Sequence, residues 1–142
     1  MADTGPLVSA ADPRDEAHGL AAAMVSALGR DLVVPSPVMV EVDYLLRARV
    51  GLRAARAFLS ALVAGEHSTA FLSPGLLRRA TEIDERYAAL DLGLVDASIM
   101  AYAERHRLPV LTFDFEDFRA APPASGHWSL VVDEARYAES IG

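Results

Sequence analysis

Short apolar runs alternate along the chain with longer stretches in which apolar positions recur at helical spacing. The apolar runs predict strands at residues 2–8, 31–34, 69–72, 109–113 and 129–132. Strands that alternate with helices are typical of a parallel sheet covered by helices. The pattern therefore predicts an α/β fold with a central, mostly parallel five-stranded sheet flanked by helices.

Capping signals place the helices between these strands. Ser36 followed by Pro37 indicates an N-cap and a proline at the first helical position, so a helix is expected to run from residue 38 to about residue 49, with Gly51 marking its end. Ser73 and Pro74 repeat the signal before a helix that extends to about residue 89. Helical periodicity or short apolar patterning predicts further helices at residues 52–63, 95–105 and 134–142.

Length and composition favour a single domain over residues 1–142. The 142 residues are 52% hydrophobic, enough for a sizeable core, and no repeat or linker divides them. No apolar run approaches the roughly 18 residues of a membrane span, so no membrane association is expected. The first residues lack a basic region followed by an apolar stretch, and there is no cysteine, so we expect a cytoplasmic protein.

The charged residues narrow the chemistry. All 13 basic residues are arginine, which excludes mechanisms that need a catalytic lysine. The net charge of −7 argues against a nucleic-acid coat protein but is compatible with a nuclease whose acids hold metal. Four arginines cluster in and after the helix predicted at residue 38, and they form either a solvated helix face or a rim that contacts phosphates: Arg47, Arg49, Arg53 and Arg56.

Four acids stand in apolar surroundings where solvated carboxylates are unusual: Asp3, Glu41, Asp96 and Asp114. A carboxylate among apolar side chains is costly unless a positive or hydrogen-bonding group offsets it. Four carboxylates that converge would require a cation. The pattern therefore points to a hard metal ion such as Mg²⁺ or Mn²⁺, which prefers oxygen ligands.

The predicted elements allow these acids to meet. Asp3 and Asp114 fall at or just past the first and fourth strands, and ligands of open α/β sheets bind beyond the carboxyl ends of strands. Asp96 lies in the first turn of a helix and Glu41 about one turn into another, with Glu41 flanked by positions expected to be buried. The alternatives are a disordered Asp3, an unpartnered Asp96 and an Asp114 that only caps a turn.

The motifs around the acids resemble those of PIN-domain nucleases and are most similar to VapC-type toxins of bacterial toxin–antitoxin pairs. In chain order they are Asp-Thr-Gly-Pro-Leu-Val from residue 3, Val-Glu-Val-Asp-Tyr-Leu from residue 40, Leu-Val-Asp-Ala-Ser-Ile-Met-Ala from residue 94 and Leu-Thr-Phe-Asp-Phe-Glu-Asp-Phe from residue 111. The resemblance spans nearly the whole chain. It implies a PIN-like three-layer fold, in agreement with the pattern of strands and helices.

The resemblance also implies a site and a set of partners. Asp3, Glu41, Asp96 and Asp114 would be the catalytic and metal-binding residues, with accompanying hydroxyls at Thr4, Thr112 and Ser98. Asp117 would either join the site or cap a short helical turn around Phe118. The implied protein is a Mg²⁺- or Mn²⁺-dependent endoribonuclease, the toxin of a type II pair, with an RNA substrate, a cognate antitoxin and a homodimeric state.

Two points in the sequence leave alternatives open. Only Met1 and Ala2 precede Asp3, fewer than in family members, so either the first strand is short or the sequence starts downstream of the true start. The helix predicted at residue 38 has more apolar residues than one core-facing stripe needs, and with the helix at 52–63 it would form a groove for an antitoxin helix or simply fill the core.

Other functions fit less well. Asp3-Thr4-Gly5 matches an aspartic protease half-site, but such proteases are all-β and this chain has at least four helical segments. Receiver domains and haloacid-dehalogenase-type phosphatases share an acidic α/β site but need a lysine. The remaining alternatives are a PIN-like binding module without activity and a stand-alone RNA-processing nuclease.

Overall fold

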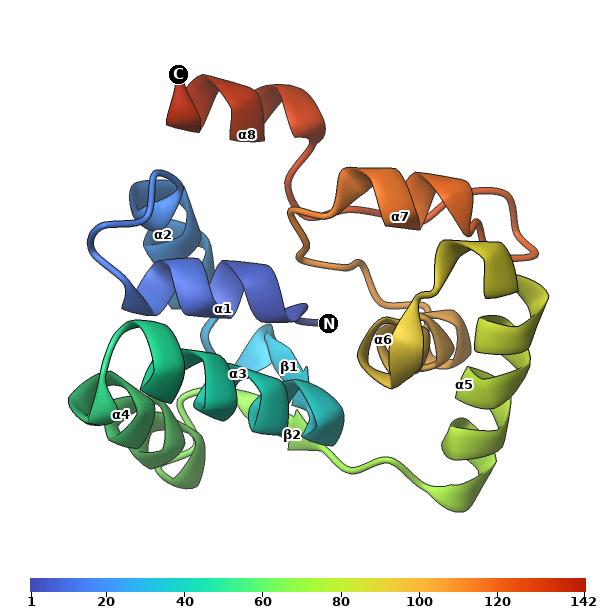
Figure 1. Ribbon diagram of the computed structural model, residues 1–142, viewed down its shortest axis with the longest axis horizontal. Helices are drawn as coiled ribbons and strands as arrows, with labels where there is room; N and C mark the ends of the chain where they lie inside the picture. Colours follow the sequence, from blue (N-terminus) through green and yellow to red (C-terminus); the bar gives the residue numbers. More distant parts are fainter.

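Five short extended segments are joined by backbone hydrogen bonds in a computed structural model that describes residues 1–142, and Figure 1 labels the two that form strands. Two of them are strands, β1 (Val33–Pro35) and β2 (Ser68–Ala70), paired in parallel. The other three pair through single parallel bridges, Ala2 with Leu111 and Val110 with Leu130. The predicted α/β fold is therefore confirmed, although only two of the segments are long enough to form regular strands.

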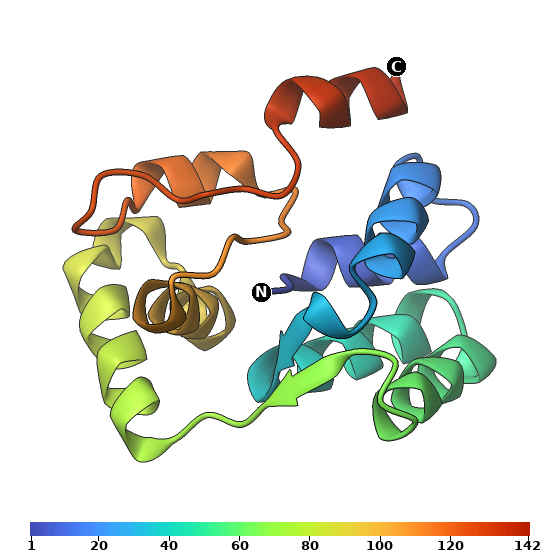
Figure 2. The same cartoon turned by 180° about the vertical axis from the view of Figure 1, so that it is seen from behind.

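Backbone hydrogen bonds fix the order of the segments. The Ala2 amide donates to the Val33 carbonyl (2.8 Å), the Leu111 amide donates to the Met1 carbonyl (2.8 Å), and the Val110 amide donates to the Ser129 carbonyl (2.8 Å). The order across the array is β2, β1, residues 1–3, residues 110–112 and residues 129–131. The N-terminal residues thus lie in the middle, as the position of the N label in Figures 1 and 2 shows.

The predicted first strand at residues 2–8 is wrong beyond its first residues. The chain turns at Asp3 into helix α1 (Thr4–Ala11). Asp3 has an extended backbone and its side chain accepts a hydrogen bond from the Thr4 amide (2.7 Å), the geometry of a helix N-cap. Pro6 falls in the first turn, where a missing amide proton costs nothing, whereas a central strand would need that proton. The apolar run Pro6–Val8 therefore packs as a helix face.

Seven more α-helices and two short 3₁₀ turns complete the chain. They are α2 (His18–Leu28), η1 (Gly29–Asp31), α3 (Ser36–Arg49), α4 (Leu52–Val63), α5 (Pro74–Arg86), η2 (Ala88–Leu90), α6 (Gly93–His106), α7 (Phe115–Ala120) and α8 (Glu134–Ile141). In Figure 1, α1 and α3 lie in front of the two strands, and Figure 2 shows the strands in front with α2 beside them, so helices flank both faces. None of the helices is both long and apolar enough to cross a membrane.

Most predicted helices are present, with shifted ends. Ser73 caps α5 by accepting from the Leu76 amide (3.2 Å), as its position before Pro74 predicted. Ser36 does not cap α3; it is the first helical residue, and its hydroxyl accepts instead from the Leu72 amide (3.1 Å) beyond β2. No element was predicted for residues 12–30, where α2 lies.

The core is a single cluster in which α6 is the most deeply buried helix. Seven consecutive residues of α6, Ala97–Ala103, are buried, because α5 packs on one side and α3 on another. The Tyr102 hydroxyl donates to the Phe71 carbonyl, which ties α6 to the segment that follows β2. Because α6 is held on several sides, the residues at its N-terminal end have fixed positions.

One buried hydroxyl in this core has no partner. Ser98 is fully buried and its Oγ makes no hydrogen bond. An unpaired buried polar group is destabilising, and alanine is also the better helix former. We therefore expect Ser98→Ala to raise the free energy of unfolding by about 1 kcal/mol, measured by urea denaturation. Thr112→Ala, which removes a buried hydroxyl that is bonded twice, should lower it by about 1–3 kcal/mol. A lower free energy of unfolding in Ser98→Ala would contradict the conclusion that the Ser98 hydroxyl has no hydrogen-bond partner.

Candidate metal centre

A pocket of about 500 Å³ opens where the central segments end, and all four acids singled out in the sequence line it. Its walls come from the start of α1, the loop before α2, one side of α3, the first turn of α6 and the turn before α7. The lining residues are Asp3, Thr4, Gly5, Val8, Ser9, Asp15, Glu41, Leu45, Arg49, Asp96, Phe113 and Asp114. Acids from four separate parts of the chain therefore face one space.

Asp3 is the buried floor of the pocket. Only 7% of its surface is exposed, and it joins the end of the central segment to the first turn of α1. Its Oδ2 accepts a hydrogen bond from the Thr112 hydroxyl (2.7 Å), and the same hydroxyl oxygen accepts one from the Asp114 amide (2.9 Å). Thr112 thus links the ends of two neighbouring segments and fixes the orientation of the Asp3 carboxylate.

Asp96, Asp114 and Asp117 form the tightest group of acids. One oxygen from each of these carboxylates lies within 4.8 Å of the others. Asp96 stands in the first turn of α6, and Asp114 caps α7 by accepting from the Asp117 amide (3.2 Å). The short α7 helix therefore brings Asp117 back toward Asp96. Both roles considered for Asp117 in the sequence meet here, since its amide is capped and its carboxylate joins the cluster.

Glu41 reaches the pocket from α3. It is half-buried, one turn into the helix, and shares its side of α3 with Leu45 and Arg49. The expectation that its neighbours are buried is half wrong. Val42 is fully buried, but 72% of the Val40 surface is exposed, because successive helical residues point about 100° apart and only one of the two faces the core.

Burial and mutual repulsion raise the pKa values of the central acids. The pKa of Asp96 rises to about 7, first because the carboxyl is buried and then because Asp3, Asp114, Asp117 and Glu41 are near. Burial also raises the pKa of Asp3, against the hydrogen bonds from Thr112 and the Thr4 amide, which lower it. The pKa of Asp117 is raised by burial and by Asp114. Burial and crowding together thus disfavour the fully ionised cluster.

The hydroxyls assigned by resemblance have different surroundings. Thr112 is bonded within the site, as described above. Thr4 lines the pocket, and its buried Oγ1 has no hydrogen-bond partner in the protein. Ser98 does not line the pocket; it lies two residues beyond Asp96 and so on another face of α6, inside the core. We therefore leave Ser98 out of the candidate site.

Two charged lining residues were not assigned to the acidic site from the sequence. Asp15 lies in the loop before α2, where its Oδ1 accepts from the Ala17 amide (2.8 Å), and nothing in Asp-Pro-Arg-Asp distinguishes it from an ordinary turn acid. Arg49 belongs to the arginine cluster noted above, but the pattern gave no reason to single it out. Only the packing of α3 beside α1 shows that it lines the pocket.

The donor set fits a hard divalent cation. The polar side chains of the pocket are carboxylates and hydroxyls apart from Arg49, with no histidine or cysteine to favour zinc. Crowded carboxylates with raised pKa values gain most from a positive charge between them. The unpartnered Oγ1 of Thr4 adds a buried oxygen at the floor. The residues present therefore suit an ion such as Mg²⁺ or Mn²⁺.

Comparison with known proteins agrees with the fold. The family model of the PIN domain matches residues 1–122. Ribonuclease VapC26 of Mycobacterium tuberculosis strain H37Rv is 30% identical over 131 residues, which cover 92% of this chain and 97% of that protein. The solved structure of Mycobacterium tuberculosis VapC20, described as a sarcin–ricin loop cleaving toxin, aligns with a TM-score of 0.74 at 22% identity, over 81% of this chain and 89% of that one.

The chain belongs to the PIN-domain family. The match to VapC20 shows the shared fold, and the match to VapC26 extends over nearly the full length of both chains. The resemblance seen in the sequence motifs, to PIN-domain nucleases of the VapC type, is therefore confirmed.

The raised pKa of Asp96 predicts how the metal-free protein responds to pH. In EDTA the folded protein keeps a proton on Asp96 up to about pH 7, whereas the unfolded chain releases it near 3.8, so stability is lost as pH rises through this range. Asp96→Asn removes that loss. We expect the variant to melt at a higher temperature than the wild type at about pH 8 and to differ much less at about pH 5. An equal difference at both pH values would contradict a raised pKa.

Proposed function

We propose that the chain is a metal-dependent endoribonuclease, the toxin of a type II toxin–antitoxin pair, which hydrolyses phosphodiester bonds of RNA. The observation that carries this proposal is the convergence of Asp3, Glu41, Asp96 and Asp114 on one pocket in a PIN-domain protein. The similarity to a protein named a ribonuclease, over 97% of the length of that protein, supports it further. Residues 1–142 act as one domain in this proposal, and the protein works in the cytoplasm.

Within this proposal the acids divide the work. Asp3, Asp96 and Asp114 hold one or two Mg²⁺ or Mn²⁺ ions, and Asp117 supports them from α7. Glu41 either completes the ligand set or positions the attacking water from α3. A divalent ion held by these acids would supply positive charge to activate water and to stabilise the phosphoryl oxygens. The arrangement of acids matches that need, because it concentrates negative charge at one point.

The uncharged residues of the site hold the acids in place. Thr112 keeps the Asp3 carboxylate aimed into the pocket, since its hydroxyl donates to Oδ2 while its oxygen is fixed by the Asp114 amide. Groups that orient metal ligands in this way commonly change metal affinity by about 10–100-fold when they are removed. The RNA substrate enters from solvent, and an exposed single-stranded loop suits the open pocket better than a duplex does, because its bases are unstacked.

The activity is tested with purified protein and RNA. Incubation of the wild type with total cellular RNA and Mg²⁺ or Mn²⁺, followed by sequencing of the new ends, should reveal defined cleavage sites. Asp96→Asn should abolish cleavage while the circular dichroism spectrum stays unchanged, because a metal-binding carboxylate is lost. Glu85→Gln, which removes an exposed carboxylate on α5 away from the pocket, is the matched control and should cleave normally. Cleavage that persists undiminished in EDTA would refute the metal mechanism.

Two exposed apolar surfaces suit the protein partners of this proposal. Val40, Tyr44 and Leu94 line an open, mostly apolar groove between α3 and the start of α6, which we assign to the homodimer contact. Leu52, Leu59 and Val63 form an exposed apolar stripe along α4, which we assign to an amphipathic helix of the antitoxin. Leu46 belongs to the helix whose excess of apolar residues suggested an antitoxin groove in the sequence, but it is fully buried in the core.

Co-expression tests these partners. Expression of the chain alone should arrest growth, and co-expression of the neighbouring open reading frame should restore it and yield a complex that survives size-exclusion chromatography. Light scattering of the purified Asp96→Asn protein should give the mass of a dimer, about twice the 15.2 kDa of the chain. If the protein is a monomer, does not harm the cell and does not bind the product of the neighbouring open reading frame, the remaining function is that of a stand-alone nuclease.

A further inference from the structure

Arg49 is the only cation among the twelve residues that line the acidic pocket. The other charged lining residues are all acids: Asp3, Asp15, Glu41, Asp96 and Asp114. A positive side chain in such a place either neutralises a neighbouring carboxylate or is available to a negatively charged ligand. The contacts of Arg49 distinguish these roles.

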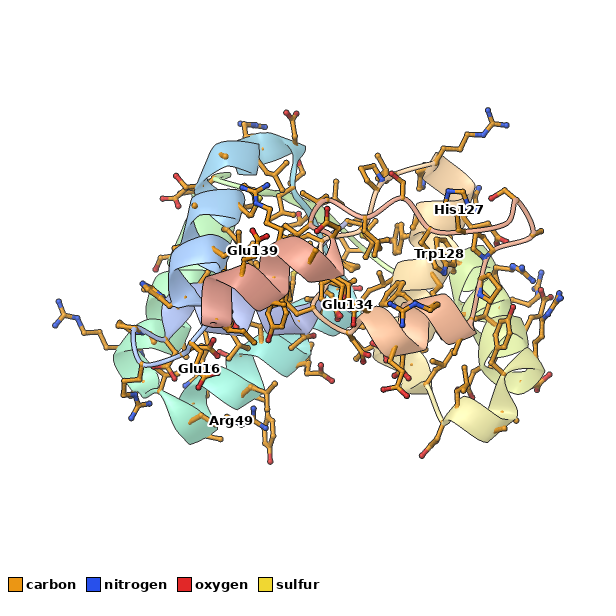
Figure 3. All side chains as sticks on the ribbon, turned by 90° about the horizontal axis from the view of Figure 1, so that it is seen from above. Glu16, Arg49, His127, Trp128, Glu134 and Glu139 are labelled. Atoms are coloured by element: carbon orange, nitrogen blue, oxygen red, sulfur yellow. The ribbon has the colours of Figure 1, made fainter.

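The Arg49 guanidinium is not used by the protein. None of the five ion pairs in the structure includes it, and its side chain makes no hydrogen bond. The main causes of the pKa shifts of Asp3 and Asp96 are burial, hydrogen bonds to Asp3 and the other acids, and Arg49 is not among them. The side chain is exposed, and Figure 3 shows it at the end of α3. Arg49 is thus a free cation at the rim of the acidic cluster.

The other arginines of the cluster differ from it. Arg47 does not line the pocket and forms an ion pair with Asp43 one turn earlier (2.9 Å). Arg53 and Arg56 are exposed on α4 and do not line the pocket. Of the four arginines that the sequence grouped together, the fold therefore selects one for the site.

The backbone of Arg49 is anchored although its side chain is free. It is the last residue of α3, and its carbonyl accepts a hydrogen bond from the Arg14 guanidinium (2.9 Å), which is itself held by Asp12 (3.1 Å). Glu41, Leu45 and Arg49 follow one another at intervals of four along one side of the helix, so Arg49 starts about 12 Å further along the axis than Glu41. Helical side chains lean toward the N-terminus, which brings the guanidinium back toward the acids.

We propose that Arg49 binds a backbone phosphate of the RNA next to the one that is cleaved, and so sets the path of the strand along α3. This inference rests on the proposed ribonuclease function. The scissile phosphate lies at the acids, where bound metal makes the local charge favourable, and the strand continues past Leu45. A guanidinium can hold a phosphate through two parallel hydrogen bonds, which fixes position as well as adding affinity. Arg49 is a positioning residue in this scheme and takes no part in bond cleavage.

The test uses an RNA oligonucleotide that spans a cleavage site mapped as described above. Loss of one charged phosphate contact should raise KM about tenfold in Arg49→Gln while kcat changes little. The slope of log KM against log salt concentration should become shallower by about 0.7, the value for one phosphate contact on a single strand. Arg49→Lys keeps the charge without the paired geometry and should recover part of the loss. Arg47→Gln, two residues away on the same helix, should behave as the wild type.

Chemical neutralisation of the RNA separates a phosphate contact from a structural role. A series of oligonucleotides carries one uncharged methylphosphonate at each position flanking the cleaved bond. At one position this change should lower the kcat/KM of the wild type about tenfold and leave that of Arg49→Gln unaffected, because the contact is already missing. Equal losses in both proteins at every position would overturn the inference, even with cleavage intact. If the wild type cleaves no RNA, the proposed function fails and the inference falls with it.

Discussion

The placement of the N-terminal residues between β1 and residues 110–112 is the constraint on which the site depends. Backbone bonds from Ala2 to Val33 and from Leu111 to Met1 hold this segment in the middle of the parallel array. The Thr112 hydroxyl then bonds to the Asp3 carboxylate and to the Asp114 amide. Two acids that are 111 positions apart in sequence are thereby fixed at the same edge of the fold. A shift of either segment would separate them.

The carboxylates that meet at this edge of the fold repel one another, and their burial is unfavourable when they are ionised. Asp96 lies in the first turn of the most buried helix of the protein, and its pKa of about 7 reflects burial as well as the acids around it. Such an arrangement opposes folding of the metal-free protein in its ionised form. A divalent cation would remove much of this penalty because it offsets all the nearby carboxylates at once. Stability and metal binding are therefore coupled through this cluster of acids. In the metal-free protein, packing in the rest of the core must offset the repulsion within the cluster.

Helix α3 has three sides with different environments: the core, the acidic pocket and an exposed apolar groove. Val38, Val42 and Leu46 are fully buried and hold the helix against the core. Glu41, Leu45 and Arg49 line the acidic pocket, and Val40 and Tyr44 are exposed beside Leu94. Because a helix turns about 100° per residue, neighbours in sequence face different surroundings. One buried stripe is thus sufficient to position both the acid side and the exposed apolar side of the helix.

The sequence by itself determined the class of fold and identified most of the acids of the candidate site. Alternating apolar runs and helical periods follow from local backbone preferences, so the α/β class, the α5 cap at Ser73 and the isolated acids were all visible in it. The acids were noticeable because charge among apolar residues is rare without a reason. The motif order then indicated the PIN family, which the comparisons confirmed.

Only the tertiary structure decided what depends on contacts between distant residues. The run after Asp3 became a helix because an N-cap and a proline in the first turn outweigh its strand-like composition. Asp117 joined the acids because α7 folds back toward Asp96, and Ser98 left them because its face of α6 points into the core. Arg49 became distinct from Arg47 by packing alone, since one lines the pocket and the other pairs with Asp43. Local sequence sets the direction of each side chain on its own helix, but the surroundings that it meets are set by how the helices pack.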